Sequence, residues 1–126
     1  MGVAEGVGKL YFSAYNLSMK RAFRTGTFIK WFRKLNDGIG KALILKRINR
    51  LKKGNPGDIE PVGEGIFEIR IHYGPGYRVY YKDASNEIIL LLCGGDKSTQ
   101  QKDITKAKEL AQMPLSEFKE DSDGNY

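Results

Sequence analysis

The sequence predicts a small α+β domain: a mainly antiparallel β-sheet with two N-terminal helices packed on one face and a C-terminal helix, which we expect on that face too. Residues 67–81 alternate apolar and polar side chains around Gly74-Pro75-Gly76, which indicates a β-hairpin. Segments before and after this hairpin carry apolar residues at helical spacing. The 126 residues are enough to bury one core without disulfides or metals. The predicted element order is β-α-α-β-β-β-α.

The first two elements are a short strand and an amphipathic helix. Residues 20–24 suit the strand. From Phe28 to Leu35, apolar side chains recur at i, i+3, i+4 and i+7, which is typical of one buried helix face. Thr25 or Thr27 can cap this helix, and Asp37-Gly38 breaks it.

A second helix is predicted over residues 39–53, with Gly54 as the residue past its end. Its buried side contains Leu43 or Ile44, together with Ile48 and Leu51. Its outer side is basic and consists of Lys46, Arg47, Arg50 and Lys53.

The hairpin has two distinct faces. The face expected in the core carries Phe67, Ile69, Ile71 and Tyr73, and the other carries Glu68, Arg70 and His72. With a three-residue turn, Tyr73 would lie opposite Tyr77. The polar pairs would then be His72 with Arg78, Arg70 with Tyr80, and Glu68 with Lys82.

The remaining elements follow the hairpin. Residues 87–93 form a nearly unbroken apolar run, which predicts a central strand covered on both sides. Ser98 and Gln101 can form a capping box for a last helix over residues 100–112. We therefore expect three parts: an N-terminal extension that can be disordered (1–18), the folded domain (19–112) and an acidic mobile tail (113–126).

Charge is distributed unevenly along the chain. The net charge is +6, yet residues 20–53 hold twelve Lys and Arg against Asp37 alone, a net charge of +11. A solvated helix face usually mixes both signs, so this segment favours a polyanion or an acidic protein as partner. A basic surface that only confers solubility is the alternative.

Several classes of function are disfavoured. One histidine, one cysteine and no clustered carboxylates make a metal site unexpected, and no phosphate-binding loop points to a nucleotide cofactor. Cys93 ends an apolar run and is expected to be a buried apolar residue. No stretch approaches the ~20 apolar residues that span a bilayer, and no signal peptide is evident. We expect a cytoplasmic protein that needs no membrane.

The polar face of the hairpin suits a phosphate group. Arg70 and Arg78 can grip a phosphodiester bidentately, Tyr80 can stack on a base, and Lys82 or Lys97 can add a point charge. RNA can be cleaved without metal when the 2′-OH attacks its own phosphate and arginines stabilise the dianion that forms.

Two residues are weaker candidates for the proton transfer. His72 or Glu68 could accept the proton, because both titrate in an accessible range. Each also has a structural interpretation. His72 can be a solvated residue at a strand end, and Glu68 can form a cross-strand charge pair with Lys82.

Three separated segments carry a family resemblance: residues 54–58 (GNPGD), residues 74–81 (GPGYRVYY), and residues 91–100 (LLCGGDKSTQ) with Asp103-Ile104. Together they resemble the RelE/ParE superfamily, and more closely its HigB-like, phage-derived "addiction module killer protein" branch. The resemblance covers about residues 19–112.

The resemblance implies the toxin of a type II toxin–antitoxin pair, acting as a ribosome-dependent mRNA endonuclease that inhibits translation. The implied partners are the ribosome, mRNA and a cognate antitoxin of the DNA-binding helix-turn-helix type. Arg78 falls where such toxins keep a catalytic arginine, Arg70 where they keep a lysine, and Lys97 in a loop with a further basic residue. Glu68 stands where a second basic residue would be expected, and no tyrosine follows Lys97. For such an activity we expect the basic helix face and the hairpin to bind RNA through Lys46, Arg47, Arg50, Lys53, Tyr80 and Lys82.

Two alternatives remain open at the level of sequence. ParE-like relatives share the fold and inhibit DNA gyrase, so the fold does not decide the target. The chain could also be a non-catalytic module that only binds an acidic antitoxin segment. Arg70, Arg78 and Lys97 together favour RNA.

Overall fold

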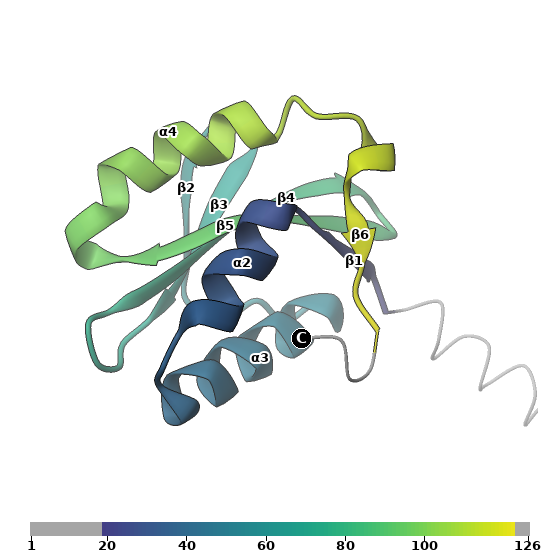
Figure 1. Cartoon of the computed structure of the whole chain (residues 1–126). Helices are drawn as coiled ribbons and strands as arrows, with labels where there is room; N and C mark the ends of the chain where they lie inside the picture. Colours follow the sequence, from purple (N-terminus) through teal and green to yellow (C-terminus); the bar gives the residue numbers. More distant parts are fainter. Residues whose placement is uncertain (1–18, 123–126) are drawn as a thin grey trace, which may run out of the picture.

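The strands join into one mixed sheet with helices on both of its faces (Figure 1). The structure is a computed structural model that describes residues 19–122, so the expected extension over 1–18 lies outside the described residues. The strands are β1 (Arg21–Arg24), β2 (Ile59–Gly63), β3 (Ile66–Ile71), β4 (Tyr77–Ser85), β5 (Ile88–Asp96) and β6 (Lys119–Glu120). The helices are α2 (Gly26–Lys34), α3 (Gly38–Lys52) and α4 (Gln100–Leu110), with short 3-10 turns at Lys97–Thr99 and Leu115–Glu117.

The strand order is β2-β3-β4-β5-β1-β6. β1 pairs with β5 in parallel, and every other pairing in the described sheet is antiparallel. The predicted α+β class is therefore confirmed. β5 has a neighbour on each side and is buried along most of its length, as its apolar run predicts.

The two faces of the sheet belong to separate cores. On one face, α2 and α3 contribute Phe28, Phe32, Ile44, Ile48 and Leu51, which pack with inward residues of β3, β4 and β5. On the other face, α4 contributes Ala107 and Leu110 and packs on Ile66, Tyr80, Leu90 and Leu92. The expectation that all helices share one face is therefore wrong for α4. The physical reason is that β5 is apolar on both faces, so the second face must be covered as well.

Side chains fix where the first two helices begin. The Thr25 hydroxyl accepts a hydrogen bond from Phe28 N at 2.9 Å, so Thr25 caps α2. Asp37 does not only end the first helix. Its carboxylate accepts from Gly40 N at 2.9 Å and caps α3. Gly54 follows α3 with a φ of 84°, a conformation that glycine adopts easily.

The hairpin turn is longer than the sequence suggested. β3 ends at Ile71 and β4 begins at Tyr77, which leaves residues 72–76 as the turn. The register therefore shifts by two residues from the predicted one. Arg70 lies opposite Arg78 rather than Tyr80, and Glu68 lies opposite Tyr80 rather than Lys82. The two faces keep their residues because a shift of two preserves the alternation.

Two strands were not predicted. β2 pairs with β3 at one edge of the sheet. β6 pairs with β1 at the other edge and lies in the segment that we expected to be mobile. Arg21 binds Glu120 at 2.8 Å and Lys52 binds Asp121 at 3.1 Å, while Phe118 is buried against the α4 core. The acidic tail is thus attached to the sheet up to Asp121, because its carboxylates meet basic side chains there.

Candidate functional site

Two arginines from adjacent strands converge on one carboxylate. Arg70 of β3 and Arg78 of β4 are register partners. Their Nε atoms lie 3.7 Å and 3.6 Å from Oε1 of Glu68. We call these three residues, together with Lys97 and Gln100, the arginine site. The observed register places the two arginines directly opposite each other, whereas the predicted register placed Arg70 opposite Tyr80.

Glu68 is the buried centre of the arginine site. The residue is 1% exposed. Its Oε2 atom accepts a hydrogen bond from Tyr80 Oη at 2.8 Å and another from Gln100 Nε2 at 2.8 Å. A buried carboxylate is costly unless it is hydrogen-bonded and paired, and Glu68 meets both conditions. The expected charge pair with Lys82 does not form, because Lys82 lies opposite Ile66.

The two arginines differ in accessibility. The Arg70 side chain is 35% exposed, whereas that of Arg78 is 3% exposed. The Nη1 group of Arg78 donates to the carbonyls of Gly76 at 3.0 Å and Tyr77 at 3.2 Å. The Nε atoms of both arginines are buried and have no hydrogen-bond partner within residues 19–122. Each arginine therefore keeps an unused donor at the point where the two side chains meet.

Lys97, which follows β5, places its side chain next to Gly76, close to Arg78. A Cβ atom added to Gly76 would lie 2.6 Å from Cδ of Lys97 and 3.5 Å from Nη1 of Arg78. The lysine stem thus crosses the turn over Gly76, which has a φ of 79°. Only glycine combines the positive φ with the absence of a Cβ atom that this close approach requires. The structure thus brings Arg70, Arg78 and Glu68 together and places the stem of Lys97 nearby.

His72 lies apart from the arginine site. Its ring is exposed, and Nε2 lies 2.5 Å from Oδ2 of Asp58. The hydrogen bond with His72 lowers the pKa of Asp58 below its ordinary value. Because β3 has ended at Ile71, His72 no longer follows the alternation that would point it toward Arg78. Its expected pairing with Arg78 is wrong.

Tyr80 is part of the core beneath the arginine site. It is 0% exposed, and α4 packs over its face of the sheet. Burial and the hydrogen bond to Glu68 raise the pKa of Tyr80 far above its ordinary value. The prediction that Tyr80 stacks on a base is therefore wrong for this conformation.

A second cavity of about 220 Å³ lies between α3 and the end of β3. Its lining residues are Leu43, Lys46, Arg47, Arg50, Ile71, His72 and Tyr73. Tyr73 is 36% exposed here, although we expected it in the core. The cavity combines cationic and ring side chains, which suits a nucleotide.

Arg47 lines this cavity and also holds two backbone segments together. It donates to the carbonyls of Arg70 at 2.7 Å, Pro56 at 3.0 Å and Asp58 at 3.0 Å. These bonds fasten the loop before β2 to the end of β3. Most of the Arg47 guanidinium is therefore occupied by carbonyls of the protein itself. Lys46, Arg50 and Lys53, in contrast, form no ion pair within the described chain.

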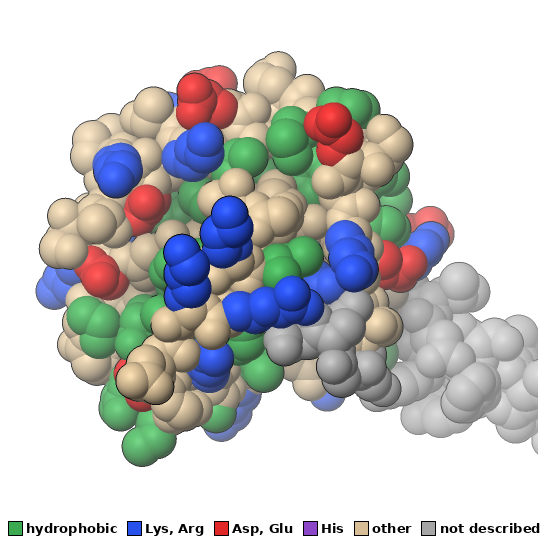
Figure 2. All heavy atoms as spheres, viewed as in Figure 1, with side chains coloured by type: hydrophobic (Ala, Val, Ile, Leu, Met, Phe, Trp, Pro, Cys, Tyr) green, Lys and Arg blue, Asp and Glu red, His purple; other side chains and the backbone are tan. Residues whose placement is uncertain are grey.

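Basic side chains also gather around α2. Figure 2 shows lysine and arginine side chains near the centre of this view, over the region where Figure 1 places α2 and α3. A groove of about 390 Å³ runs beside α2 and is lined by Gly26, Thr27, Lys30, Trp31 and Lys34. This surface matches the basic block that the sequence shows over residues 20–53.

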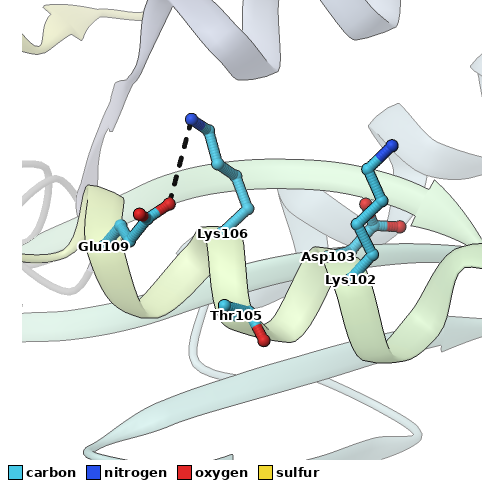
Figure 3. Close-up of a pocket in the computed structure, with 5 residues that line it drawn as sticks. All are labelled: Lys102, Asp103, Thr105, Lys106 and Glu109. Carbon is cyan, nitrogen blue, oxygen red and sulfur yellow. Dashed lines mark ion pairs between the residues drawn. The ribbon is translucent and has the colours of Figure 1, made fainter.

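The outer surface of α4 is different, because it mixes charges. A hollow of about 510 Å³ is lined by Lys102, Asp103, Thr105, Lys106 and Glu109 (Figure 3). Lys106 reaches Glu109 at 4.0 Å, drawn as the dashed line. Burial raises the pKa of Asp103. The acidic groups make this hollow a poor site for a polyanion.

Two features of the site were missed at the level of sequence. Gln100 was expected only as the start of a helix, and nothing in its spacing indicates that it reaches Glu68. The expected capping box of Ser98 and Gln101 is wrong: Asp96 caps the 3-10 turn before α4, where its carboxylate accepts from Ser98 N at 2.8 Å, and Thr99 precedes α4 without a side-chain cap bond. Gly94 and Gly95 are explained by close packing, because a Cβ atom would meet Trp31 on one face and Asp103 on the other.

Residues 19–122 contain no group of three or more His, Cys, Asp or Glu residues arranged to hold a metal ion. In the same range, no helix is both long and apolar enough to cross a membrane.

Comparison with known proteins identifies the family. The model of the family described as "Phage derived protein Gp49-like (DUF891)" matches residues 30–114, from within α2 to just beyond α4. An uncharacterized protein of Haemophilus influenzae is 57% identical over 88 residues, which cover 70% of this chain and 89% of that protein. No solved structure matches. The chain therefore belongs to the Gp49-like family of addiction-module toxins, which implies an antitoxin as its partner.

Proposed function

We propose that this protein is a toxin that cleaves mRNA on the ribosome, and that the arginine site holds the scissile phosphate without a metal ion. The observation that carries the proposal is the direct cross-strand pair of Arg70 and Arg78. Two arginines facing each other repel unless an anion lies between them. Glu68 supplies only one negative charge for two guanidinium groups, so a phosphate remains attractive there.

The chemistry follows from RNA itself. The 2′-hydroxyl gives up its proton as its oxygen forms a bond to the adjacent phosphorus, and the 5′-oxygen takes up a proton as its bond to phosphorus breaks. A pentavalent dianion lies between the two states. Planar guanidinium groups can bind two oxygens of this dianion at once. Arg70 is the accessible member and would meet RNA first. Arg78 lies behind it, held by the carbonyls of Gly76 and Tyr77, and would add its charge from below.

The basic surface of α3, on the opposite face of the sheet from the arginine site, supports binding to a larger RNA. Lys46 and Arg50 line the cavity next to His72 and Tyr73, and Lys53 follows at the end of α3. We propose that these cations contact phosphates of ribosomal RNA or mRNA. Lys82 and Arg47 are weaker members of this set, because Arg47 already binds three carbonyls.

The test is toe-printing of mRNA on programmed ribosomes with the wild type and Arg78→Ala. We expect cleavage by the wild type and a loss of about 100-fold or more in the variant, as for removal of a group that stabilises the transition state. Lys106→Ala is the matched control, since Lys106 is exposed on α4 and pairs only with Glu109 among the described carboxylates. Equal cleavage by wild type and Arg78→Ala would show that the assignment is wrong.

The same preparations separate the proposal from its two alternatives. A gyrase inhibitor would block supercoiling by purified gyrase and leave mRNA intact. A module that only binds antitoxin would not arrest growth when expressed alone. We expect growth arrest that Arg70→Ala/Arg78→Ala abolishes, with no effect on gyrase.

A further inference from the structure

We infer that Glu68 is a positioning residue rather than the general base, and that Tyr80 and Gln100 hold it so that it sets the two arginines for phosphate. This inference rests on the proposed function, whose reaction it deepens. The contacts among Glu68, Tyr80, Gln100 and the arginine pair carry it.

The two oxygens of Glu68 have separate partners. Oε2 accepts from the neutral donors Tyr80 Oη and Gln100 Nε2, each at 2.8 Å. Oε1 faces the two arginine Nε atoms, at 3.7 Å for Arg70 and 3.6 Å for Arg78. The hydrogen bonds on Oε2 fix the rotation of the carboxylate and direct Oε1 between the arginines. A carboxylate so held defines where both guanidinium groups lie.

The distances leave the arginines available for substrate. At 3.6–3.7 Å, the Nε atoms are attracted to Glu68 but do not donate hydrogen bonds to it. Both Nε atoms are without a hydrogen-bond partner in the described part of the chain. Glu68 therefore offsets the repulsion between the arginines without consuming their donors. A bound phosphate would meet the guanidinium of Arg70, whose side chain is the more accessible of the two.

The position of Glu68 argues against a role as base. A general base must come within about 3 Å of the proton-bearing oxygen, directly or through one water. Glu68 is 1% exposed, and Tyr80 beneath it is 0% exposed. Arg70 is the accessible member of this cluster, with 35% of its side chain exposed. An attacking 2′-OH would thus meet an arginine before it reached the carboxylate.

Gln100 links the network to α4. It is the first residue of α4 and is half-buried, while the adjacent Gln101 is exposed. Tyr80 comes from β4 and is fixed by the core. The position of Glu68 therefore depends on how α4 is seated on the sheet. Gln100 is the member whose replacement changes neither a charge nor the core.

The kinetic test compares Gln100→Leu and Glu68→Gln with the control Gln101→Leu. Single-turnover cleavage on programmed ribosomes gives a maximal rate, a half-saturating concentration and a pH profile. We expect both site variants to lose about 100-fold in maximal rate, the scale of a small misplacement of reacting groups. The half-saturating concentration should change little, and the pH profile of the cleavage rate should keep the shape seen for the wild type. If Glu68→Gln removes the acidic limb of the profile while Gln100→Leu cleaves normally, Glu68 is the base and the inference fails.

A second measurement does not depend on activity. Nitrogen-15 spectra of the arginine Nε–H groups, assigned with Arg70→Lys and Arg78→Lys, report directly on the arginine pair. We expect slow hydrogen exchange at both groups in the wild type and in Gln101→Leu, and at least tenfold faster exchange in Gln100→Leu. Unchanged exchange in Gln100→Leu would overturn the inference, whether or not the protein cleaves mRNA. A wild type that shows the protected signals but does not cleave mRNA would count against the proposed function alone.

Discussion

At the scale of single residues, burial separates the candidate residues by role. Arg70 and Arg78 carry the same charge, yet only Arg70 is open to solvent. The sequence predicts both arginines because alternation on the hairpin is local. It does not predict that His72 turns toward Asp58, because that contact joins residues 14 positions apart across the end of a strand.

Replacement of Arg78 by lysine tests whether cleavage needs the planar guanidinium group or only its positive charge. Arg78→Lys keeps the positive charge but cannot bind two phosphate oxygens at once. We expect a loss of about 10- to 100-fold in single-turnover cleavage, with an unchanged circular dichroism spectrum. A rate within twofold of the wild type would mean that charge alone suffices.

Tyr77 gives a prediction about alkaline pH. Its hydroxyl donates to Asp37 at 2.7 Å, and this bond together with burial raises the pKa of Tyr77 to about 12. The unfolded chain loses this proton near the ordinary value of 10.0, so the folded state is favoured less and less as pH rises from there toward 12. Urea unfolding between pH 8 and about 12 should show a smaller decline in stability for Tyr77→Phe than for the wild type. Equal declines would contradict the assignment.

At the scale of elements, the glycine pair of β5 decides how closely two helices approach the sheet. A Cβ atom on Gly94 would clash with the ring of Trp31 in α2. On the opposite face, a Cβ atom on Gly95 would lie within bonding distance of the Asp103 carboxylate in α4. The sequence shows both glycines and both helical patterns. It does not show that the helices meet the glycines from opposite sides.

Alanine at these positions should therefore destabilise the fold. We expect Gly94→Ala to cost about 1–3 kcal/mol, because added volume in a packed core forces its neighbours to move. Gly95→Ala should cost a similar amount, and the double variant Gly95→Ala/Asp103→Ala should recover part of it, since the clashing carboxylate is gone. Urea unfolding of the single and double variants measures this coupling. Strict additivity would show that Gly95 and Asp103 do not interact.

At the scale of the whole molecule, opposite charges at the two ends of the domain are brought together. The basic block over residues 20–53 contributes Arg21 and Lys52, which bind Glu120 and Asp121 of the tail. β6 thereby covers the outer edge of β1. Composition predicts attraction between these segments, but it does not predict that the tail pairs as a strand.

Removal of residues 115–126 should expose this edge. The truncated chain loses the burial of Phe118, which is 8% exposed, and we expect a loss of about 2 kcal/mol in stability. An unpaired strand edge also favours association between chains. The apparent molecular mass from light scattering should therefore increase with concentration for the truncated chain. Phe118→Ala in the full chain is the comparison, because it removes the burial but keeps the β6 pairing. A truncated chain as stable and as monomeric as the full one would contradict this role.

The sequence by itself determined the helix faces, the two faces of the hairpin and the basic block, because periodicity and charge are properties of neighbouring residues. The tertiary structure decided which polar residues meet. A five-residue turn sets Arg70 opposite Arg78, α4 buries Tyr80, and Gln100 reaches Glu68 from a different element. Register depends on how the turn closes, and burial depends on which helix covers a face. Both are set by packing over distances that local patterns do not encode.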